Sequence, residues 1–331
     1  MTGPSPITAE EPQRLLEVDG LEVVFPTRRG ALRAVDGISY DIATRRTLGV
    51  VGESGCGKSV TALTLLRLVP PPGAITGGSI HLEGIDLLSL SETQMERVRG
   101  NRIAMIFQEP MTSLNPVFTV GDQIAEAFRI HRNASRAEAR EQAVELLHRV
   151  GIPAPRARAR DYPHRLSGGM RQRAMIAMAL ACRPALLIAD EPTTALDVTV
   201  QAQILELMLE IQAAFGMAIQ FISHNLGVIS EVADEVMVMY AGRVVEHAPA
   251  QALFANPLHP YTRALMDTVP RLGRRRRPTA IPGTVPDPFD LPRGCRFSDR
   301  CPLVGAECRE AEPELLDEGG GHRVACFKAG Q

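Results

Sequence analysis

The chain has 331 residues, of which 45% are hydrophobic and 22% are charged, and these values are ordinary for a folded globular protein. They exclude a mainly disordered, collagen-like or fibrous chain, and the length favours about two domains. The formal net charge is only −2 at pH 7, so the chain has no overall positive excess with which to bind nucleic acid by counterion release. We therefore predict no nucleic-acid partner.

Membrane insertion and secretion are not expected either. No apolar stretch approaches the ~18 residues that a membrane span needs. The N-terminus contains acids and prolines where a signal peptide needs basic residues followed by an apolar run. We expect the chain to stay in the cytosol, where its six cysteines are not expected to form structural disulfides.

Strands are predicted before helices in the first part of the chain. Alternating apolar and polar residues over 15–50 are typical of short antiparallel strands, and residues 47–51 are typical of a buried parallel strand. The pattern turns helical from Lys58 to Val69, and residues 111–165 are expected to be mostly helical. Two capping boxes are expected, namely Ser91 with Gln94 and Ser135 with Glu138.

Three more apolar runs predict buried strands, at 103–107, 185–190 and 218–223. An amphipathic helix that ends at Gly216 separates the last two. Because strands that alternate with helices imply a mostly parallel sheet covered on both faces, the predicted fold class is α/β. A hairpin over 235–247 follows.

The composition changes after about residue 250, where prolines become frequent. This change indicates a linker and then a small appendage. The linker includes the basic run Arg274–Arg277, which we interpret as solvated.

The segment between the predicted strand at 47–51 and the predicted helix has the spacing of a phosphate-binding loop. It comprises Gly52, Glu53, Ser54, Gly55, Cys56, Gly57, Lys58 and Ser59. Glycines allow backbone N–H groups to surround the phosphates, and the helix N-terminus adds a favourable potential. We expect Lys58 to reach the β- and γ-phosphates and Ser59 to ligate Mg²⁺, with Cys56 as a small filler.

An acidic pair follows the predicted strand at 185–190. Asp190 is expected at the carboxyl end of that strand, where ligands bind in open parallel sheets, and would hold Mg²⁺ through water. Glu191 would polarise the attacking water. A strand that merely ends in an exposed acidic pair is the plain alternative, and the phosphate-binding loop is what decides against it.

The segment Leu166-Ser167-Gly168-Gly169-Met170 narrows the class. Together with the phosphate-binding loop and the acidic pair, it resembles the signature of the nucleotide-binding subunits of ABC transporters. The resemblance covers about residues 15–250 as an ATP-binding domain. It implies a P-loop NTPase fold with an antiparallel β subdomain and a helical signature subdomain at about 111–175.

The resemblance also assigns roles around the nucleotide. Gln108 corresponds to a loop glutamine that touches Mg²⁺ and senses the membrane partner, and His224 to a switch histidine that contacts the γ-phosphate. Phe25 is the candidate to stack on adenine, although a core position is an equally good interpretation. Val60 stands where many relatives have threonine, but its backbone N–H can still donate to the phosphates.

A head-to-tail dimer is implied as well. Ser167, Gly168 and Gly169 of one chain would close over nucleotide bound by the other chain, so that ATP holds the dimer together. The loop 194–197, with Asp197, would communicate across the dimer. Hydrolysis would then release the two chains.

Longer segments resemble the ATPases of oligopeptide and dipeptide importers over nearly the whole chain. These segments are VGESGCGKSVTAL, FQEPMTSLNP, YPHRLSGGMRQR, DEPTTALDVTVQAQIL, NPLHPYTRAL and PDPFDLPRGCRFSDRCP. SVTAL and GGMRQR favour the first of the two ATPase subunits that such importers usually carry. In this family MTSLNP, at residues 111–116, lies where a coupling helix of the membrane subunit docks.

This closer resemblance implies ATP and Mg²⁺ as cofactors and a peripheral position at the cytoplasmic face of the inner membrane. It also implies a second ATPase subunit, two transmembrane permease subunits and an external solute-binding protein. Import of nickel or another small solute by the same machinery is one alternative. A soluble ABC ATPase in DNA repair or translation is another, disfavoured because such proteins commonly carry two cassettes or large inserted arms.

The extension at 251–331 contains Cys295, Cys301, Cys308 and Cys326, separated by five, six and seventeen residues. Structural zinc sites prefer pairs with about two to four intervening residues, whereas thiolates from irregular loops suit an iron–sulfur cluster. The family resemblance implies a [4Fe–4S] cluster; zinc and unliganded thiols are the alternatives. We expect such a cluster to stabilise the tail by cross-linking it, because the tail lacks a hydrophobic core of its own.

Overall fold

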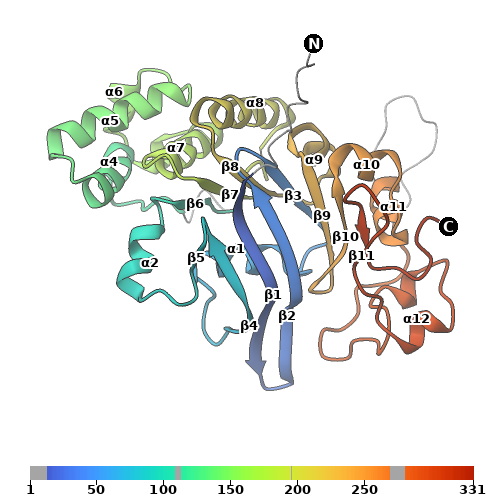
Figure 1. Ribbon diagram of the computed structural model, residues 1–331. Helices are drawn as coiled ribbons and strands as arrows, with labels where there is room; N and C mark the ends of the chain where they lie inside the picture. The colour runs from blue at the N-terminus through green and yellow to red at the C-terminus, as the bar shows by residue number, and fades with distance from the viewer. Residues whose placement is uncertain (1–12, 109–112, 195, 269–279) are drawn as a thin grey trace, which may run out of the picture.

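The computed structural model in Figure 1 describes the chain in four segments, which are residues 13–108, 113–194, 196–268 and 280–331. Three predictions fall wholly or partly outside these segments. They concern Met111 and Thr112 of the expected docking segment, Ala195 of the dimer loop and the arginine run at 274–277.

A four-stranded antiparallel sheet with the order β2-β1-β4-β5 forms the N-terminal part of the molecule. Its strands are β1 (Arg14–Thr27), β2 (Gly30–Ala43), β4 (Ala74–Leu82) and β5 (Ile85–Asp86). The expected antiparallel strands are confirmed, and alternate side chains such as Leu16 and Val18 are buried. β1 and β2 have 14 residues each and are longer than predicted, and register shifts divide their pairing.

The second sheet has eight strands in the order β11-β12-β10-β9-β3-β8-β7-β6. The parallel strands are β3 (Thr47–Val51), β6 (Ile103–Ile106), β7 (Leu186–Asp190) and β8 (Ala218–Ile222), with β9 (Glu235–Tyr240) parallel to β3. The antiparallel edge consists of β10 (Arg243–Pro249), β11 (Leu316–Asp317) and β12 (Arg323–Val324). The α/β fold class is therefore confirmed, as is the hairpin that turns at Ala241-Gly242.

Helices cover the parallel sheet and form a separate group at the end away from the extension (Figure 1). The first set comprises α1 (Lys58–Leu65), α2 (Glu92–Val98), α8 (Val198–Phe215) and α9 (Leu226–Val232). The separate group comprises α4 (Val120–Arg132), α5 (Arg136–Arg149), α6 (Pro155–Arg158), the 3₁₀ turn η1 (Pro163–Arg165) and α7 (Gly168–Leu180). None of the helices in the four described segments is both long enough and apolar enough to cross a bilayer.

Local sequence signals set several helix ends. Both predicted capping boxes are present, at the starts of α2 and α5, and α8 ends at Gly216 with φ 66°. Helix α1 ends at Leu65, earlier than the predicted Val69. The reason is that Arg67 adopts a positive φ of 52°, and the N–H of Leu68 turns back to the carbonyl of Leu63.

The C-terminal extension contains α10 (Ala250–Ala255), α11 (Pro260–Asp267), η2 (Ser298–Arg300) and α12 (Glu307–Glu310). It continues the large sheet, because β12 pairs with β10. Glu246 of β10 is fully buried, and it accepts hydrogen bonds from the backbone N–H groups of Leu258 (2.6 Å) and His259 (3.0 Å). It also contacts the ring of His322 at 2.7 Å. The proposed division at residue 250 stays a prediction.

Aromatic packing ties the extension to the sheet. The ring of Phe297 lies 5.3 Å from that of Tyr240 on β9 and 5.4 Å from that of Tyr261 on α11. All three side chains are buried. The extension therefore shares the core of the ATP-binding part.

We predict that Phe297→Ala lowers the free energy of unfolding by about 3–5 kcal/mol, because it opens a cavity between the extension and β9. Urea denaturation followed by circular dichroism measures this loss. Phe118→Ala is the matched control, since Phe118 is 54% exposed and its truncation should change stability little. Equal effects of the two substitutions would contradict the shared core.

Candidate functional site

A cavity of about 890 Å³ opens above the phosphate-binding loop. It is bounded by the loop, the β1–β2 hairpin, the β9–β10 turn and a segment of the C-terminal extension. Nine residues that the sequence singled out line it, namely Phe25, Ser54, Gly55, Gly57, Lys58, Ser59, Val60, Gln108 and Glu191. Tertiary structure thus brings most of the predicted nucleotide residues to one place.

The phosphate-binding loop is held in shape by its own lysine. The Nζ of Lys58 donates to the carbonyls of Gly52 (2.7 Å) and Glu53 (3.1 Å), and the side chain is buried. Gly57 has φ 105°, and a Cβ there would lie 2.5 Å from the carbonyl oxygen of Ala34. Only glycine fits this close approach of two backbones, which places the start of α1 beneath the cavity.

Asp190 ends the fully buried strand β7, as predicted. The hydroxyl of Ser59 hydrogen-bonds to its carboxyl group, while Oδ1 is buried and has no hydrogen-bond partner among the described residues. Burial is the main cause that raises the pKa of Asp190, and the neighbouring Glu191 adds to it. A buried carboxylate oxygen without a partner, beside a hydroxyl, is an arrangement suited to an oxygen-ligated cation such as Mg²⁺.

Glu191 is the meeting point of three predicted elements. Its Oε1 lies 3.1 Å from Nδ1 of His224, and its Oε2 accepts hydrogen bonds from Gln108 (3.2 Å) and Thr194 (2.9 Å). Burial would raise the pKa of Glu191, but the hydrogen bonds from His224 and Thr194 outweigh burial and lower it. The ionised carboxylate can accept a proton from a water molecule.

The signature and the dimer loop lie elsewhere on the chain. The side chain of Ser167 caps α7 by accepting the N–H of Met170, and Asp197 caps α8 by accepting the N–H of Val200. Ser167 and Gly168 are exposed, and neither is among the residues that line the cavity. The structure therefore does not bring the signature to the nucleotide cavity of the same chain.

Sequence reasoning missed the contacts between the extension and the phosphate-binding loop. The guanidinium of Arg300 donates to both carboxylate oxygens of Glu53, at 2.7 and 3.1 Å. The backbone N–H of Glu53 donates to the hydroxyl of Tyr261 at 2.9 Å. These partners lie more than 200 residues apart in the sequence, and no local pattern indicates that they meet.

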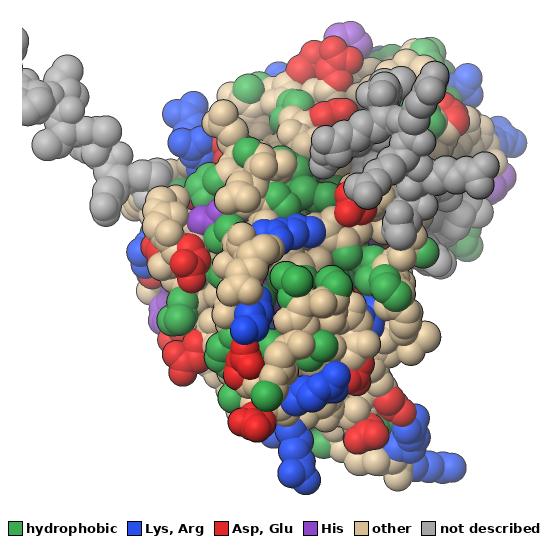
Figure 2. Space-filling model, turned by 90° about the vertical axis from the view of Figure 1, so that its right-hand side faces the viewer, with side chains coloured by type: hydrophobic (Ala, Val, Ile, Leu, Met, Phe, Trp, Pro, Cys, Tyr) green, Lys and Arg blue, Asp and Glu red, His purple; other side chains and the backbone are tan. Residues whose placement is uncertain are grey.

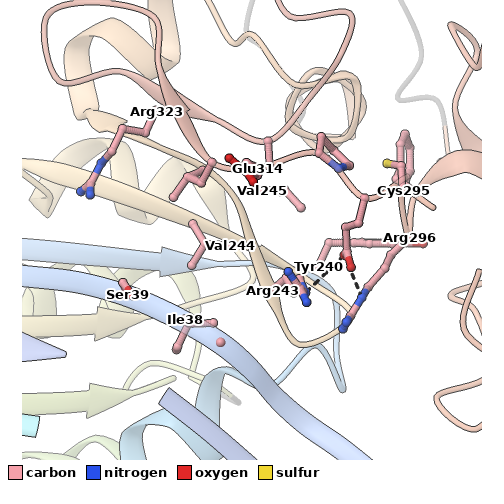
Figure 3. A pocket seen from close by; sticks show the side chains of 16 residues that line it. Ile38, Ser39, Tyr240, Arg243, Val244, Val245, Cys295, Arg296, Glu314 and Arg323 are labelled. Atoms are coloured by element: carbon pink, nitrogen blue, oxygen red, sulfur yellow. Dashed lines mark ion pairs between the residues drawn. The ribbon is translucent and has the colours of Figure 1, made fainter. Parts of the chain in front are cut away.

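A second cavity, of about 390 Å³, lies between β10 and the extension (Figure 3). At its edge Glu312 pairs with Arg243 (3.3 Å) and with Arg296 (3.1 Å), and both arginines also pair with Asp36 of β2. Burial would raise the pKa of Asp36, but its contacts with Arg296 and Arg243 outweigh burial and lower it. The network joins both sheets to the segment that begins at Cys295.

The four cysteines of the extension line one small cavity together with His259. The Nδ1 of His259 accepts the backbone N–H of Tyr261, which places the ring proton of the neutral imidazole on Nε2. That Nε2 is buried without a hydrogen-bond partner among the described residues. Among all the residues that the structure describes, no group of three or more His, Cys, Asp or Glu side chains is arranged to hold a metal ion.

A phosphate-binding loop on a parallel sheet, with an acidic pair at the end of a neighbouring strand, defines a P-loop nucleoside triphosphatase. Comparison with known proteins gives the family. Residues 35–194 match the ABC transporter family, and residues 245–308 match the oligopeptide/dipeptide transporter C-terminal region. The chain belongs to the ATP-hydrolysing subunits of ABC transporters, in the group that carries this C-terminal region.

Curated relatives share almost the whole length. The chain is 56% identical to "Probable peptide ABC transporter ATP-binding protein y4tR" of Sinorhizobium fredii, over 96% of each chain. It is 51% identical to the oligopeptide transport ATP-binding protein AppD of Bacillus subtilis, over 95% of this chain and 96% of the relative. It is 48% identical to the dipeptide transport ATP-binding protein DppD of Escherichia coli, over 94% of this chain and 96% of the relative.

Solved structures support the fold. The protein cbiO1 from Clostridium perfringens, part of the ABC transporter complex cbiONQ, superposes with a TM-score of 0.63 at 26% identity, over 73% of this chain and 91% of that chain. The ATP-binding cassette MJ0796 superposes with a TM-score of 0.65 at 24% identity, over 71% of this chain and 99% of that chain.

We predict that Glu191→Gln lowers ATP turnover at least about 100-fold, because the amide cannot accept a proton from water. The same substitution should leave ATP bound and trap an ATP-dependent dimer. Steady-state phosphate release and size-exclusion chromatography with ATP measure the two effects. Glu231→Gln, on the exposed face of α9, is the matched control. Unchanged turnover in Glu191→Gln would remove Glu191 from the catalytic role.

Proposed function

We propose that this chain energises the import of oligopeptides or dipeptides through an ABC transporter of the cell membrane. The observation that carries the proposal is the joint match of the ATP-binding region and of the oligopeptide/dipeptide C-terminal region. The names of the relatives from Bacillus subtilis and Escherichia coli, which specify oligopeptide and dipeptide transport, support the same substrate class.

The residues around the cavity have complementary tasks in this proposal. Lys58 and the backbone N–H groups of the phosphate-binding loop bind the β- and γ-phosphates. Ser59, Asp190 and Gln108 would hold Mg²⁺, which neutralises charge on the phosphates when bound. Glu191 orients the attacking water and accepts its proton, and His224 positions Glu191 while facing the γ-phosphate.

The exposed signature supports a site shared between two chains. Ser167, Gly168 and Gly169 would complete the phosphate contacts of a partner ATPase subunit, and Asp197 would lie at the same interface. The partner would be a related ATPase subunit, and the pair would bind two permease subunits at the cytoplasmic face of the membrane. An external solute-binding protein would deliver the peptide.

We predict that deletion of the gene abolishes uptake of labelled dipeptides and oligopeptides, and that wild type restores it but Lys58→Ala does not. Without the ammonium group the phosphate-binding loop cannot bind ATP productively. Uptake by intact cells measures the effect, with labelled nickel in parallel. Loss of nickel uptake alone would support the same ATP-driven import mechanism, with nickel instead of peptides as the substrate. If all uptake survived deletion, either another importer compensates or the importer assignment fails and the soluble ABC ATPase has to be considered again.

We also propose that the extension holds a [4Fe–4S] cluster. Cys295, Cys301, Cys308 and Cys326 line one cavity, into which His259 brings an unpaired N–H donor suited to a thiolate or sulfide acceptor. The four cysteines are separated by five, six and seventeen residues, unlike the closely spaced pairs of structural zinc sites. A cluster spreads its ligands over separate irons.

We predict about four iron and four sulfide per chain after anaerobic purification. Cys301→Ser should lower both, because one iron loses its thiolate. Colorimetric iron and sulfide assays, with zinc measured by mass spectrometry, give the content. Cys182→Ser is the matched control, since Cys182 is buried, its Sγ lies 3.7 Å from the carbonyl oxygen of Ala127 on α4, and it does not line the cysteine cavity. Stoichiometric zinc without iron would contradict the cluster.

A further inference from the structure

The C-terminal extension reaches the nucleotide cavity of its own chain. Residues 285–288 and Leu291 line this cavity, as do Phe25 and Leu32 of the β1–β2 hairpin. None of the extension residues belongs to the phosphate-binding loop, the acidic pair or the signature. They therefore contribute a part of the site that the nucleotide motifs do not account for.

The lining of the cavity is chemically divided. Ser54, Lys58 and Ser59 offer polar groups suited to the triphosphate and its cation. The hairpin and the extension offer mainly apolar surface, from Phe25, Leu32, Val285, Pro286 and Leu291. A nucleotide whose phosphates occupy the loop must place its nucleoside in the rest of the cavity. The planar faces of a purine suit the apolar part.

Arg29 fastens the extension to the hairpin. It lies in the two-residue turn between β1 and β2, and its guanidinium donates to Oδ2 of Asp287 at 2.6 Å. Its Cζ is 4.4 Å from the centre of the Phe289 ring. The N–H of Phe289 donates to Oδ1 of the same aspartate at 3.0 Å. The Arg29 side chain thus holds the extension around Asp287 and Phe289 against the β1–β2 hairpin.

Arg300 links the start of this segment, at Pro282, to the phosphate-binding loop. Its Nε donates to the carbonyl of Pro282 at 2.9 Å, and its terminal nitrogens pair with Glu53 of the loop. The side chain is only 4% exposed, so this contact is shielded from solvent. The segment is therefore anchored on both structures that border the cavity.

We propose that residues 285–291 form the base-side wall of the nucleotide site in their own chain, with the Arg29–Asp287 pair holding the wall in place. The proposal rests on the assignment of the phosphate end to residues 52–59. It makes the extension a determinant of ATP affinity. The segment acts on the nucleoside and not on the phosphates.

Equilibrium binding of ATP and of inorganic tripolyphosphate to the full-length chain with Mg²⁺ separates the two ends of the site. Leu291→Ser should weaken ATP binding by about tenfold through loss of apolar contact, and leave tripolyphosphate binding unchanged. Leu316→Ser is the matched control, because Leu316 is an exposed leucine of the extension outside the cavity. Lys58→Ala should weaken the binding of both ligands.

Each other result counts against a defined part of the proposal. Unchanged ATP affinity in Leu291→Ser, with both ligands lost in Lys58→Ala, overturns the wall and leaves the phosphate end in place. Equal losses of both ligands in Leu291→Ser overturn a role confined to the nucleoside. Unchanged binding in Lys58→Ala overturns the phosphate assignment and the wall with it.

A charge exchange tests the contact without disturbing the core, because the side chains of Arg29 and Asp287 are 65% and 43% exposed. Arg29→Asp and Asp287→Arg should each lower the ratio of ATP affinity to tripolyphosphate affinity by about two- to fivefold. The double exchange should restore the ratio. Arg28→Asp, at the other position of the turn, is the control for charge alone. Failure of the double exchange to restore the ratio overturns the Arg29–Asp287 contact.

Discussion

The parallel alignment of β3, β7 and β8 is the constraint on which the nucleotide site depends. Because the three strands run in the same direction, their carboxyl ends meet at one edge of the sheet. The phosphate-binding loop follows β3, the acidic pair follows β7, and His224 follows β8. The contact of His224 with Glu191 is a consequence of this alignment, since the two residues lie in different strand-end loops.

The C-terminal extension is integrated into the ATP-binding part through buried polar contacts as well as apolar packing. Glu246 accepts hydrogen bonds from two backbone N–H groups just before α11 and contacts the ring of His322, just before β12. Arg296 pairs with Asp36, and Arg300 pairs with Glu53. Arg296 follows Cys295 directly and Arg300 precedes Cys301. The backbone that carries two of the cysteines therefore also carries the arginines that hold β2 and the phosphate-binding loop. On the face shown in Figure 2, acidic and basic side chains are interspersed over this part of the surface.

Two exposed elements of the chain are those that the proposed dimer would cover. Ser167 caps a helix at the surface, and Val198, which follows Asp197, is 83% exposed. An apolar side chain at the start of α8 gains nothing from solvent, and contact with a second ATPase subunit would bury it. In the proposed dimer, the cavity of one chain and the signature of the other would be two halves of one catalytic site.

The sequence by itself determined the elements whose geometry is local. The glycines and Lys58 of the phosphate-binding loop, the capping boxes at Ser91 and Ser135, and the buried strand that ends at Asp190 each depend on residues a few positions apart. Neighbouring residues fix such backbone geometry, and so the pattern is readable in one sequence. The convergence of Gln108, His224 and Glu191 came from resemblance to a family, not from spacing.

Only the tertiary structure decided how the extension meets the nucleotide site. Arg29 and Asp287 are 258 positions apart, and the Arg300–Glu53 pair spans 247. Arg29, Asp287 and Glu53 lie in turns or loops and Arg300 ends the three-residue η2, so no hydrophobic or charge pattern records either contact. Such pairs form because β12 and the aromatic cluster dock the extension against β10 and β9, and that docking is a property of the whole folded chain.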